Sequence, residues 1–218
     1  MKKAIIFDFD YTLGDSSEGI IASINYALDK MGIKKPGRDE AVKTIGMSLG
    51  RTYEVLSGRS STSEKEDFEK YFKEKADEVM VSNTFLYNGV LEMLQNLHAK
   101  GLKTAIVTTK YHYRIEQILE INNASSLVDG IIGGDDVNTP KPSPEGINKI
   151  KEQFNVRPEE ILYAGDSVID AEAAQAAGVD FIAVLTGTTP YEAFKKYPYA
   201  GIINSVTDIE TQSFIKEK

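Results

Sequence analysis

The chain alternates short apolar runs with longer amphipathic segments. The apolar runs predict buried strands, and they are AIIF (4–7), TAIVT (104–108), GIIGG (130–134), ILYAG (161–165), FIAVL (181–185) and GII (201–203). Helical periodicity lies between several of these runs, for example in GVLEMLQNLHAKG (89–101), which has a glycine stop at Gly101. Another predicted helix begins at a Ser167 cap and ends at Gly178. Strands that alternate with helices predict an α/β fold with a parallel sheet covered on both faces.

Residues 16–82 interrupt this alternation, because they contain no convincing strand run. Two segments there have the pattern of amphipathic helices, SEGIIASINYALDKMG (17–32) and SEKEDFEKYFKEKADEVMV (63–81). We therefore expect an all-helical domain at 16–82, inserted into a core made of 1–15 and 83–218. The alternative is a set of long crossover helices that pack on a single core.

The first predicted strand runs into two carboxylates, Asp8 and Asp10. In a strand these residues point the same way and lie roughly 6.6 Å apart. An unpaired charge inside a core costs several kcal/mol. That cost vanishes at the carboxyl end of a parallel strand, where open α/β sheets bind ligands. The alternative is a pair of turn aspartates that lead into the next element.

Polar residues also follow two other predicted strands and one predicted loop. Thr108, Thr109 and Lys110 end one strand run, Asp166 and Asp170 follow another, and Lys141 lies in the proline-rich segment NTPKPSPEG. Each alone has a simpler explanation, as a helix cap, a solvated loop cation or an acidic helix N-terminus. Together they predict one site at the carboxyl edge of the sheet. Carboxylates and hydroxyls without cysteine favour a hard cation with oxygen ligands, and Mg2+ is the natural one.

Composition narrows the class of protein. The 218 residues are 41% apolar and 27% charged, with a net charge of −8 and a pI near 4.9, which argues against binding to nucleic acid or acidic membranes. There are no cysteines, which excludes disulfides and thiolate metal sites. No run approaches the roughly 20 apolar residues of a membrane span, and the N-terminal run breaks at Asp8, unlike a signal peptide. We expect a cytoplasmic protein. His98 and His112 have no partner at metal-ligand spacing.

The polar segments resemble, in order, the four motifs of the haloacid dehalogenase superfamily. DFDYT (8–12) resembles the first motif, Asp-x-Asp-x-Thr, and Thr108 the second. Lys141 in KPSP resembles the third motif, and GDSVID (165–170) the fourth. The resemblance covers nearly the whole chain, and the helical block falls where members with a cap domain carry it. It implies a Rossmann-like parallel sheet core with an inserted all-helical cap. The segments look most similar to phosphoglycolate phosphatase-like and pyrophosphatase-like members.

The resemblance also implies a mechanism centred on the first motif. Asp8 would be the nucleophile and form an aspartyl-phosphate. Asp10 would protonate the leaving oxygen and then act as base on the attacking water. Asp8, the Asp10 backbone carbonyl and Asp166 would bind Mg2+, and Asp170 would support them. Because the dehalogenases of this superfamily lack the acid/base residue, Asp10 favours phosphate chemistry over carbon–halogen cleavage.

Three residues would bind the phosphoryl oxygens, namely Thr108, Thr109 and Lys141. The family often has asparagine at the position of Thr109. Thr12 is expected to shape its loop rather than to take part in chemistry. The expected substrate is a small phosphorylated metabolite, and the expected oligomeric state is a monomer or a dimer.

Three further residues are candidates for substrate specificity: Tyr11, Arg51 and Lys110. Tyr11 stands where such enzymes usually have glycine, so a large aromatic side chain lies close to the chemistry. Arg51 belongs to the glycine-punctuated segment TIGMSLGRTYEVL (44–56) of the predicted cap; the alternative is a surface arginine. Lys110 lies near Thr108 in the chain.

Other functions remain open at this point. A β-phosphoglucomutase-like phosphosugar mutase would keep the same core, and product analysis separates it from a phosphatase. A phospho-accepting signalling module uses similar residue types, but it is shorter, has no cap and carries its aspartate on a later strand. A silent binding protein would not need every catalytic position to be filled.

Overall fold

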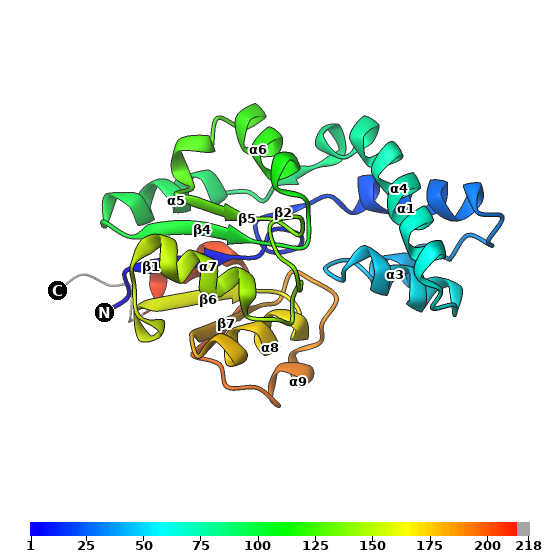
Figure 1. Ribbon diagram of the computed structural model, residues 1–218. Helices are drawn as coiled ribbons and strands as arrows, with labels where there is room; N and C mark the ends of the chain where they lie inside the picture. Colours follow the sequence, from blue (N-terminus) through cyan, green and yellow to red (C-terminus); the bar gives the residue numbers. More distant parts are fainter. Residues whose placement is uncertain (213–218) are drawn as a thin grey trace. The chain divides into compact units, whose positions relative to one another are not determined.

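The computed structural model of this protein describes residues 1–212. Its main feature is a six-stranded parallel sheet in the order β5-β4-β1-β6-β7-β8 (Figure 1). The strands are β1 (Ala4–Phe7), β4 (Lys103–Val107), β5 (Gly130–Ile132), β6 (Ile161–Gly165), β7 (Asp180–Val184) and β8 (Gly201–Ile203). All six apolar runs of the sequence form strands, which confirms the predicted parallel α/β sheet.

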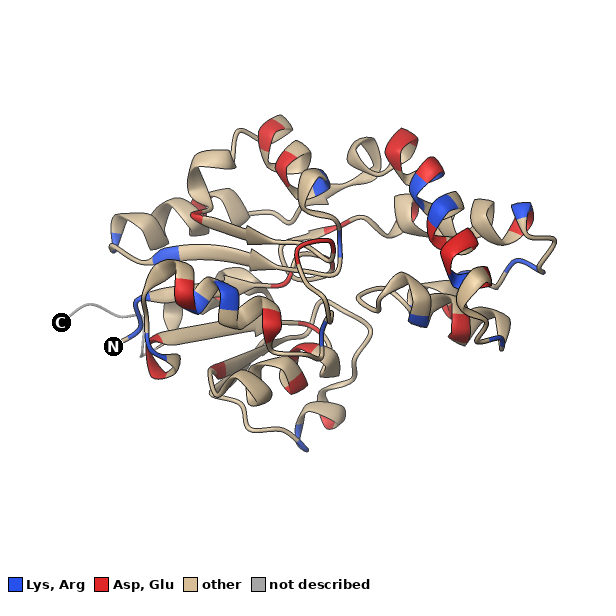
Figure 2. Cartoon of the chain, in the orientation of Figure 1, with Lys and Arg blue, Asp and Glu red and all other residues tan. Residues whose placement is uncertain are grey.

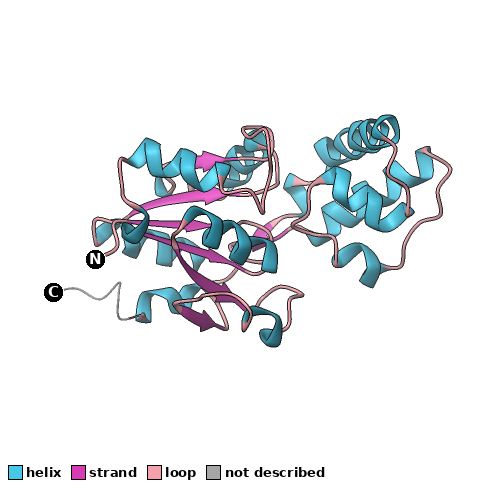
Figure 3. Cartoon of the chain, turned by 60° about the horizontal axis from the view of Figure 1, so that its bottom comes forward, coloured by secondary structure: helices cyan, strands magenta, loops and turns pink. Residues whose placement is uncertain are grey.

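The sheet is buried because helices cover it (Figure 3). Alternate strand residues share a face, and the face with Ile6 and Tyr163 packs against α7 (Glu145–Phe154) and α8 (Val168–Ala177). The Ser167 cap of α8 and its end at Gly178, with φ of 70°, are as predicted. The remaining elements of this part are α5 (Val90–Ala99), α6 (His112–Ile121), α9 (Tyr191–Phe194), η2 (Ser125–Leu127), η3 (Pro158–Glu160) and η4 (Val206–Thr211).

The chain divides into two compact units, one made of Met1–Gly14 with the chain from Leu86 onward, the other of Asp15–Phe85. The boundaries fall in β2 (Gly14–Asp15) and β3 (Phe85–Leu86), which form a small sheet of their own. The second unit is helical, with α1 (Ser17–Lys30), α2 (Arg38–Val42), α3 (Leu49–Ser57), α4 (Thr62–Val79) and η1 (Val81–Asn83). That this unit acts as a cap stays a prediction.

The second unit has its own apolar core. Phe68, Phe72 and Ala76 recur every four residues along α4 and face Ile24 and Leu28 of α1. The rest of α4 carries acidic and basic side chains along its length (Figure 2). None of the helices within residues 1–212 combines the length and the apolar character that crossing a membrane requires.

The order of the strands positions the candidate site. β1 lies at the centre, between β4 and β6, and all three run in the same direction. Their carboxyl ends are therefore neighbours, and the next residues along the chain are Asp8, Thr108 and Asp166. The sheet thus brings residues more than 150 positions apart to one edge.

Candidate active site

Asp8 and Thr108 are held by backbone bonds that continue the sheet beyond its strands. The Asp8 amide donates to the Ala164 carbonyl at 2.9 Å, and the Thr108 amide donates to the Ile132 carbonyl at 3.0 Å. Asp8 is 2% exposed and Thr108 is 4% exposed. Both side chains therefore start from fixed backbone at the edge of the sheet.

The loop after β1 closes tightly around the Phe9 carbonyl. That oxygen accepts from the amides of Thr12, Leu13 and Gly14, while the Tyr11 amide donates to the Gly14 carbonyl at 2.8 Å. Tyr11 adopts φ of +58°, in the left-handed region that favours glycine. This backbone conformation is one that glycine adopts at less cost than tyrosine. The Thr186 hydroxyl donates to the Tyr11 carbonyl and ties the loop to the chain after β7.

Three buried carboxylates converge at the edge of the sheet. Asp8, Asp166 and Asp170 each place a carboxylate oxygen within 4.8 Å of the others. Asp8 Oδ1 is buried and has no aligned hydrogen bond to any of the described residues. Asp166 accepts from the Thr12 hydroxyl at 3.3 Å, so Thr12 contacts a site residue as well as closing its loop. Asp10 approaches a different partner, described below.

Lys141 is the cation of this cluster. Its Nζ lies 2.8 Å from Asp8 Oδ1 and 2.7 Å from Asp170 Oδ1. Asp170 is locked in place, because its Oδ2 also accepts from the Ser167 amide at 3.1 Å and from the Ser167 hydroxyl at 2.6 Å. The fourth segment is thereby connected to the third through a buried ion pair.

A second buried cation lies beside the other aspartate of the first segment. Lys110 Nζ lies 3.2 Å from Asp10 Oδ2, and both side chains are less than a tenth exposed. The Lys110 amide donates to the Thr108 hydroxyl at 3.3 Å. Thr109 is half-buried. Its carbonyl oxygen packs against Gly134, and a Cβ at Gly134 would lie 2.4 Å from that oxygen. Thr108, Lys110 and Asp10 therefore belong to one neighbourhood.

Burial is the largest influence on the pKa values of two acids in the cluster, Asp8 and Asp166. Burial raises the pKa of Asp8 to about 7, although Lys141 opposes this increase and Asp170 reinforces it. Burial likewise raises the pKa of Asp166 well above its usual range, with the Asp170 charge adding to the effect. Burial would lower the pKa of Lys141, but the carboxylates of Asp170 and Asp8 outweigh burial and raise it. The negative charges of Asp8 and Asp166 are therefore not fully compensated by Lys141.

Arg51 lies in the helical unit, on α3. Its side chain is exposed, and Nη1 lies 2.9 Å from Glu54 Oε2 one turn along the helix. An exposed pair of this kind contributes little to stability. The predicted contact of Arg51 with a substrate anion stays a prediction.

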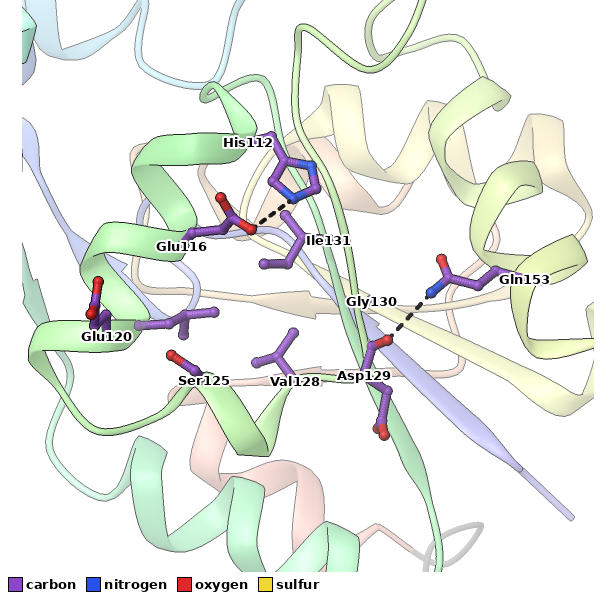
Figure 4. A pocket seen from close by; sticks show the side chains of 10 residues that line it. His112, Glu116, Glu120, Ser125, Val128, Asp129, Gly130, Ile131 and Gln153 are labelled. Atoms are coloured by element: carbon purple, nitrogen blue, oxygen red, sulfur yellow. Dashed lines mark hydrogen bonds and ion pairs between the residues drawn. The ribbon is translucent and has the colours of Figure 1, made fainter.

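His112 begins α6 and lines a hollow of about 730 Å³ next to the edge strand β5 (Figure 4). Its Nδ1 lies 2.6 Å from Asp136 Oδ2 and its Nε2 lies 3.6 Å from Glu116 Oε1. None of the residues lining the hollow belongs to the carboxylate cluster. The hollow is therefore separate from the candidate active site.

Two residues at the site were not predicted from the sequence. The Tyr163 hydroxyl lies among Lys141, Asp170 and the Val107 carbonyl. Gly187 approaches Asp166 so closely that a Cβ there would lie 1.9 Å from Asp166 Oδ2. The sequence does show a hydroxyl-bearing side chain, Tyr163, within an apolar strand run. It gives no indication of Gly187, whose importance depends on a contact between the ends of two neighbouring strands.

Comparison with known proteins decides the family. The model of the haloacid dehalogenase-like hydrolases matches residues 5–184. The chain belongs to this family. The match includes all four motif segments, and it confirms the resemblance that the sequence indicated. This hydrolase is also 30% identical over 210 residues to a phosphoglycolate phosphatase of Salmonella typhi, covering 85% of this chain and 82% of that protein. A phosphoglycolate phosphatase of Escherichia coli K12 is 28% identical to this chain, and the match covers 95% of this chain and 90% of that protein.

Solved structures show the same fold. A crystal structure from Bacteroides fragilis, assigned to the haloacid dehalogenase-like hydrolases, is 37% identical, with a TM-score of 0.93 over 96% of this chain and all of the other. A predicted phosphoglycolate phosphatase from Haemophilus somnus is 26% identical, with a TM-score of 0.82 over 96% of this chain and 97% of that one. The prediction that this hydrolase is a phosphatase enzyme is confirmed by these relatives together.

Proposed function

We propose that this hydrolase is a Mg2+-dependent phosphatase that hydrolyses a small phosphorylated metabolite through an aspartyl-phosphate on Asp8. The observation that supports this proposal is the convergence of Asp8, Asp166 and Asp170 with the Lys141 ammonium. A nucleophilic carboxylate and a cation for phosphoryl oxygens lie within 2.8 Å of each other.

The residues present fit a divalent metal ion. Four buried carboxylates, Asp8, Asp10, Asp166 and Asp170, face two buried ammonium groups, Lys110 and Lys141, which leaves a formal charge of −2 when all are ionised. Burial raises the pKa values of Asp8 and Asp166, so the charged forms of these carboxylates are not fully compensated by the two ammonium groups. Oxygen donors suit Mg2+. Asp8, Asp166 and the Asp10 backbone carbonyl would hold the ion, which supplies charge neutralisation for a phosphate dianion.

The protein residues then divide the chemistry. An Asp8 oxygen forms the new bond to phosphorus while the bond from phosphorus to the leaving oxygen breaks. Thr108 and Lys141 bind the non-bridging oxygens, where negative charge gathers. Asp10 gives its proton to the leaving oxygen. It then accepts a proton from the water that attacks the aspartyl-phosphate, which regenerates Asp8 and releases inorganic phosphate.

The relatives suggest the substrate class. Those that match over nearly the whole chain are phosphoglycolate phosphatases, so we propose a small phosphorylated carboxylate or a similar metabolite as substrate. Lys110, less than a tenth exposed and near Thr108, is the proposed cation for a second polar group. Tyr11, which stands where the family resemblance implies glycine, is proposed to modify the choice of substrate.

A screen of phosphorylated metabolites tests the proposal. Phosphoglycolate, pyrophosphate, nucleoside monophosphates and sugar phosphates are each incubated with the protein and Mg2+, and both released phosphate and organic products are measured. We expect phosphate release from at least one of them, no turnover by Asp8→Asn, and normal turnover by the matched surface variant Asp67→Asn. Full turnover by Asp8→Asn would remove Asp8 from the nucleophile position, and a transferred rather than released phosphoryl group would indicate a mutase.

A further inference from the structure

Tyr163 is a buried phenol that the mechanism above does not use. It lies on β6, between Ile6 of β1 and Phe181 of β7, and its side chain is fully buried. The Phe181 ring lies 6.3 Å from its own ring, centroid to centroid. The ring is therefore part of the core, and its position leaves the hydroxyl at the carboxyl edge of the sheet.

The hydroxyl contacts three segments that carry candidate site residues. It lies 3.1 Å from Lys141 Nζ, 2.9 Å from Asp170 Oδ1 and 3.2 Å from the carbonyl of Val107, which precedes Thr108. A single phenol thus connects the end of β4 with the Lys141 loop and the start of α8.

The hydrogen-bond donors of Lys141 and Tyr163 have defined acceptors. An ammonium has three N–H donors. Lys141 donates to Asp170 Oδ1 and to the Tyr163 hydroxyl, while Asp8 Oδ1 lies 2.8 Å away as an ion-pair partner that is not aligned for a hydrogen bond. The phenol accepts from Lys141 and has one proton left to donate. Asp170 Oδ1 is the nearer acceptor of that proton. Without the hydroxyl, the buried ammonium keeps only one of its two hydrogen-bond acceptors, Asp170, and is free to shift toward its carboxylates.

We propose that Tyr163 is a positioning residue that fixes the Lys141 ammonium beside Asp8 for phosphoryl transfer. The proposal rests on the function proposed above. Misplacement of a charged group by about 1 Å costs on the order of 100-fold in rate. Because the hydroxyl acts through Lys141, its removal should lower kcat and leave KM nearly unchanged.

Tyr163→Phe tests this, with Tyr197→Phe as the matched control. The Tyr197 ring packs against the same apolar core, but its hydroxyl donates to Glu172 at 2.7 Å. We expect kcat of Tyr163→Phe to fall by about 10- to 100-fold and that of Tyr197→Phe to stay at the wild-type value. In a Lys141→Met background Tyr163→Phe should cause no further loss. A Tyr163→Phe protein with wild-type kcat, or an undiminished loss in the Lys141→Met background, overturns the proposal.

A second measurement does not depend on turnover. The buried Lys141 ammonium is shielded from solvent exchange, so we expect its resonance in NMR spectra of isotope-labelled protein, assigned by its loss in Lys141→Met. In Tyr163→Phe that resonance should shift and broaden, and in Tyr197→Phe it should stay in place. An unchanged resonance in Tyr163→Phe refutes the positioning. If the wild-type protein releases no phosphate at all, the proposed function fails, while this measurement still decides the position of Lys141.

Discussion

Substitution of Gly187 by alanine perturbs the proposed metal site without changing any charged group. A Cβ at this position would lie 1.9 Å from Asp166 Oδ2, 2.7 Å from its Cγ and 2.9 Å from its Cβ, whereas ordinary contacts begin at 3.4 Å. The separation from Oδ2 must therefore grow by 3.4 − 1.9 = 1.5 Å. Asp166 is buried and linked to the Thr12 hydroxyl, so the carboxylate leaves its place or the backbone after β7 retreats.

Displacement of a metal ligand weakens the binding of the metal ion. We expect Gly187→Ala to bind Mg2+ about 10- to 100-fold more weakly than wild type, by analogy with the loss of groups that orient metal ligands. This corresponds to about 1.4 to 2.8 kcal/mol of binding free energy. Titration calorimetry gives the affinity directly, and Mg2+ titration of phosphate release gives it during turnover.

The control is Gly201→Ala, on β8, where the nearest atom to a new Cβ is Gln212 Oε1 at 3.4 Å. That variant should bind Mg2+ as the wild type does. The reasoning is refuted if Gly187→Ala is folded and binds Mg2+ with wild-type affinity, because Asp166 would then not be held as a ligand by this contact.

Three further predictions concern backbone strain, ionisation and helix capping. In urea unfolding, the free energy of unfolding of Tyr11→Gly should exceed that of Tyr11→Ala by about 1 kcal/mol, because only glycine avoids the cost of the left-handed φ of +58°. Equal stabilities would contradict this. In EDTA, the unfolding free energy of wild type relative to Asp8→Asn should fall as pH rises from 4 to 7, by at most about 1.4 kcal/mol per pH unit. The sign follows because folded Asp8, with a pKa of about 7 against a usual 3.8, keeps a proton that the unfolded chain has lost; a flat difference would refute it. Asp135→Ala should lose about 1 kcal/mol in urea unfolding, because Asp135 Oδ1 accepts from the His112 amide at 2.7 Å at the start of α6; Asp135→Asn should retain most of the stability, and an equal loss there would contradict capping.

The sheet could be predicted from the sequence because strands that are buried on both faces consist of consecutive apolar residues. AIIF and ILYAG coincide with β1 and β6, and the Ser167 cap and Gly178 mark the ends of α8 as expected. Asp8, Asp166 and Asp170 could be placed together because parallel neighbours end at the same edge. The i, i+2 argument for Asp8 and Asp10 was weaker, since β1 ends at Phe7 and Asp10 forms an isolated bridge with Gly14 instead.

The contacts that refine the site could not be predicted, because they depend on distances across the fold. The importance of Gly187 depends on Asp166, on a neighbouring strand end, and that of Tyr163 on a loop 22 residues earlier. The left-handed backbone of Tyr11 is set by hydrogen bonds to Phe9 and Gly14, and tyrosine itself gives no sign of it. Local periodicity carries no information on such contacts.

Diffraction from crystals soaked in Mn2+, a substitute for Mg2+ with a strong anomalous signal, tests the central claim most directly. The account predicts one anomalous peak between the carboxylates of Asp8 and Asp166, and its disappearance in crystals of Asp166→Asn. A bound ion elsewhere in the protein, with Asp8 and Asp166 not sharing it, would contradict the account.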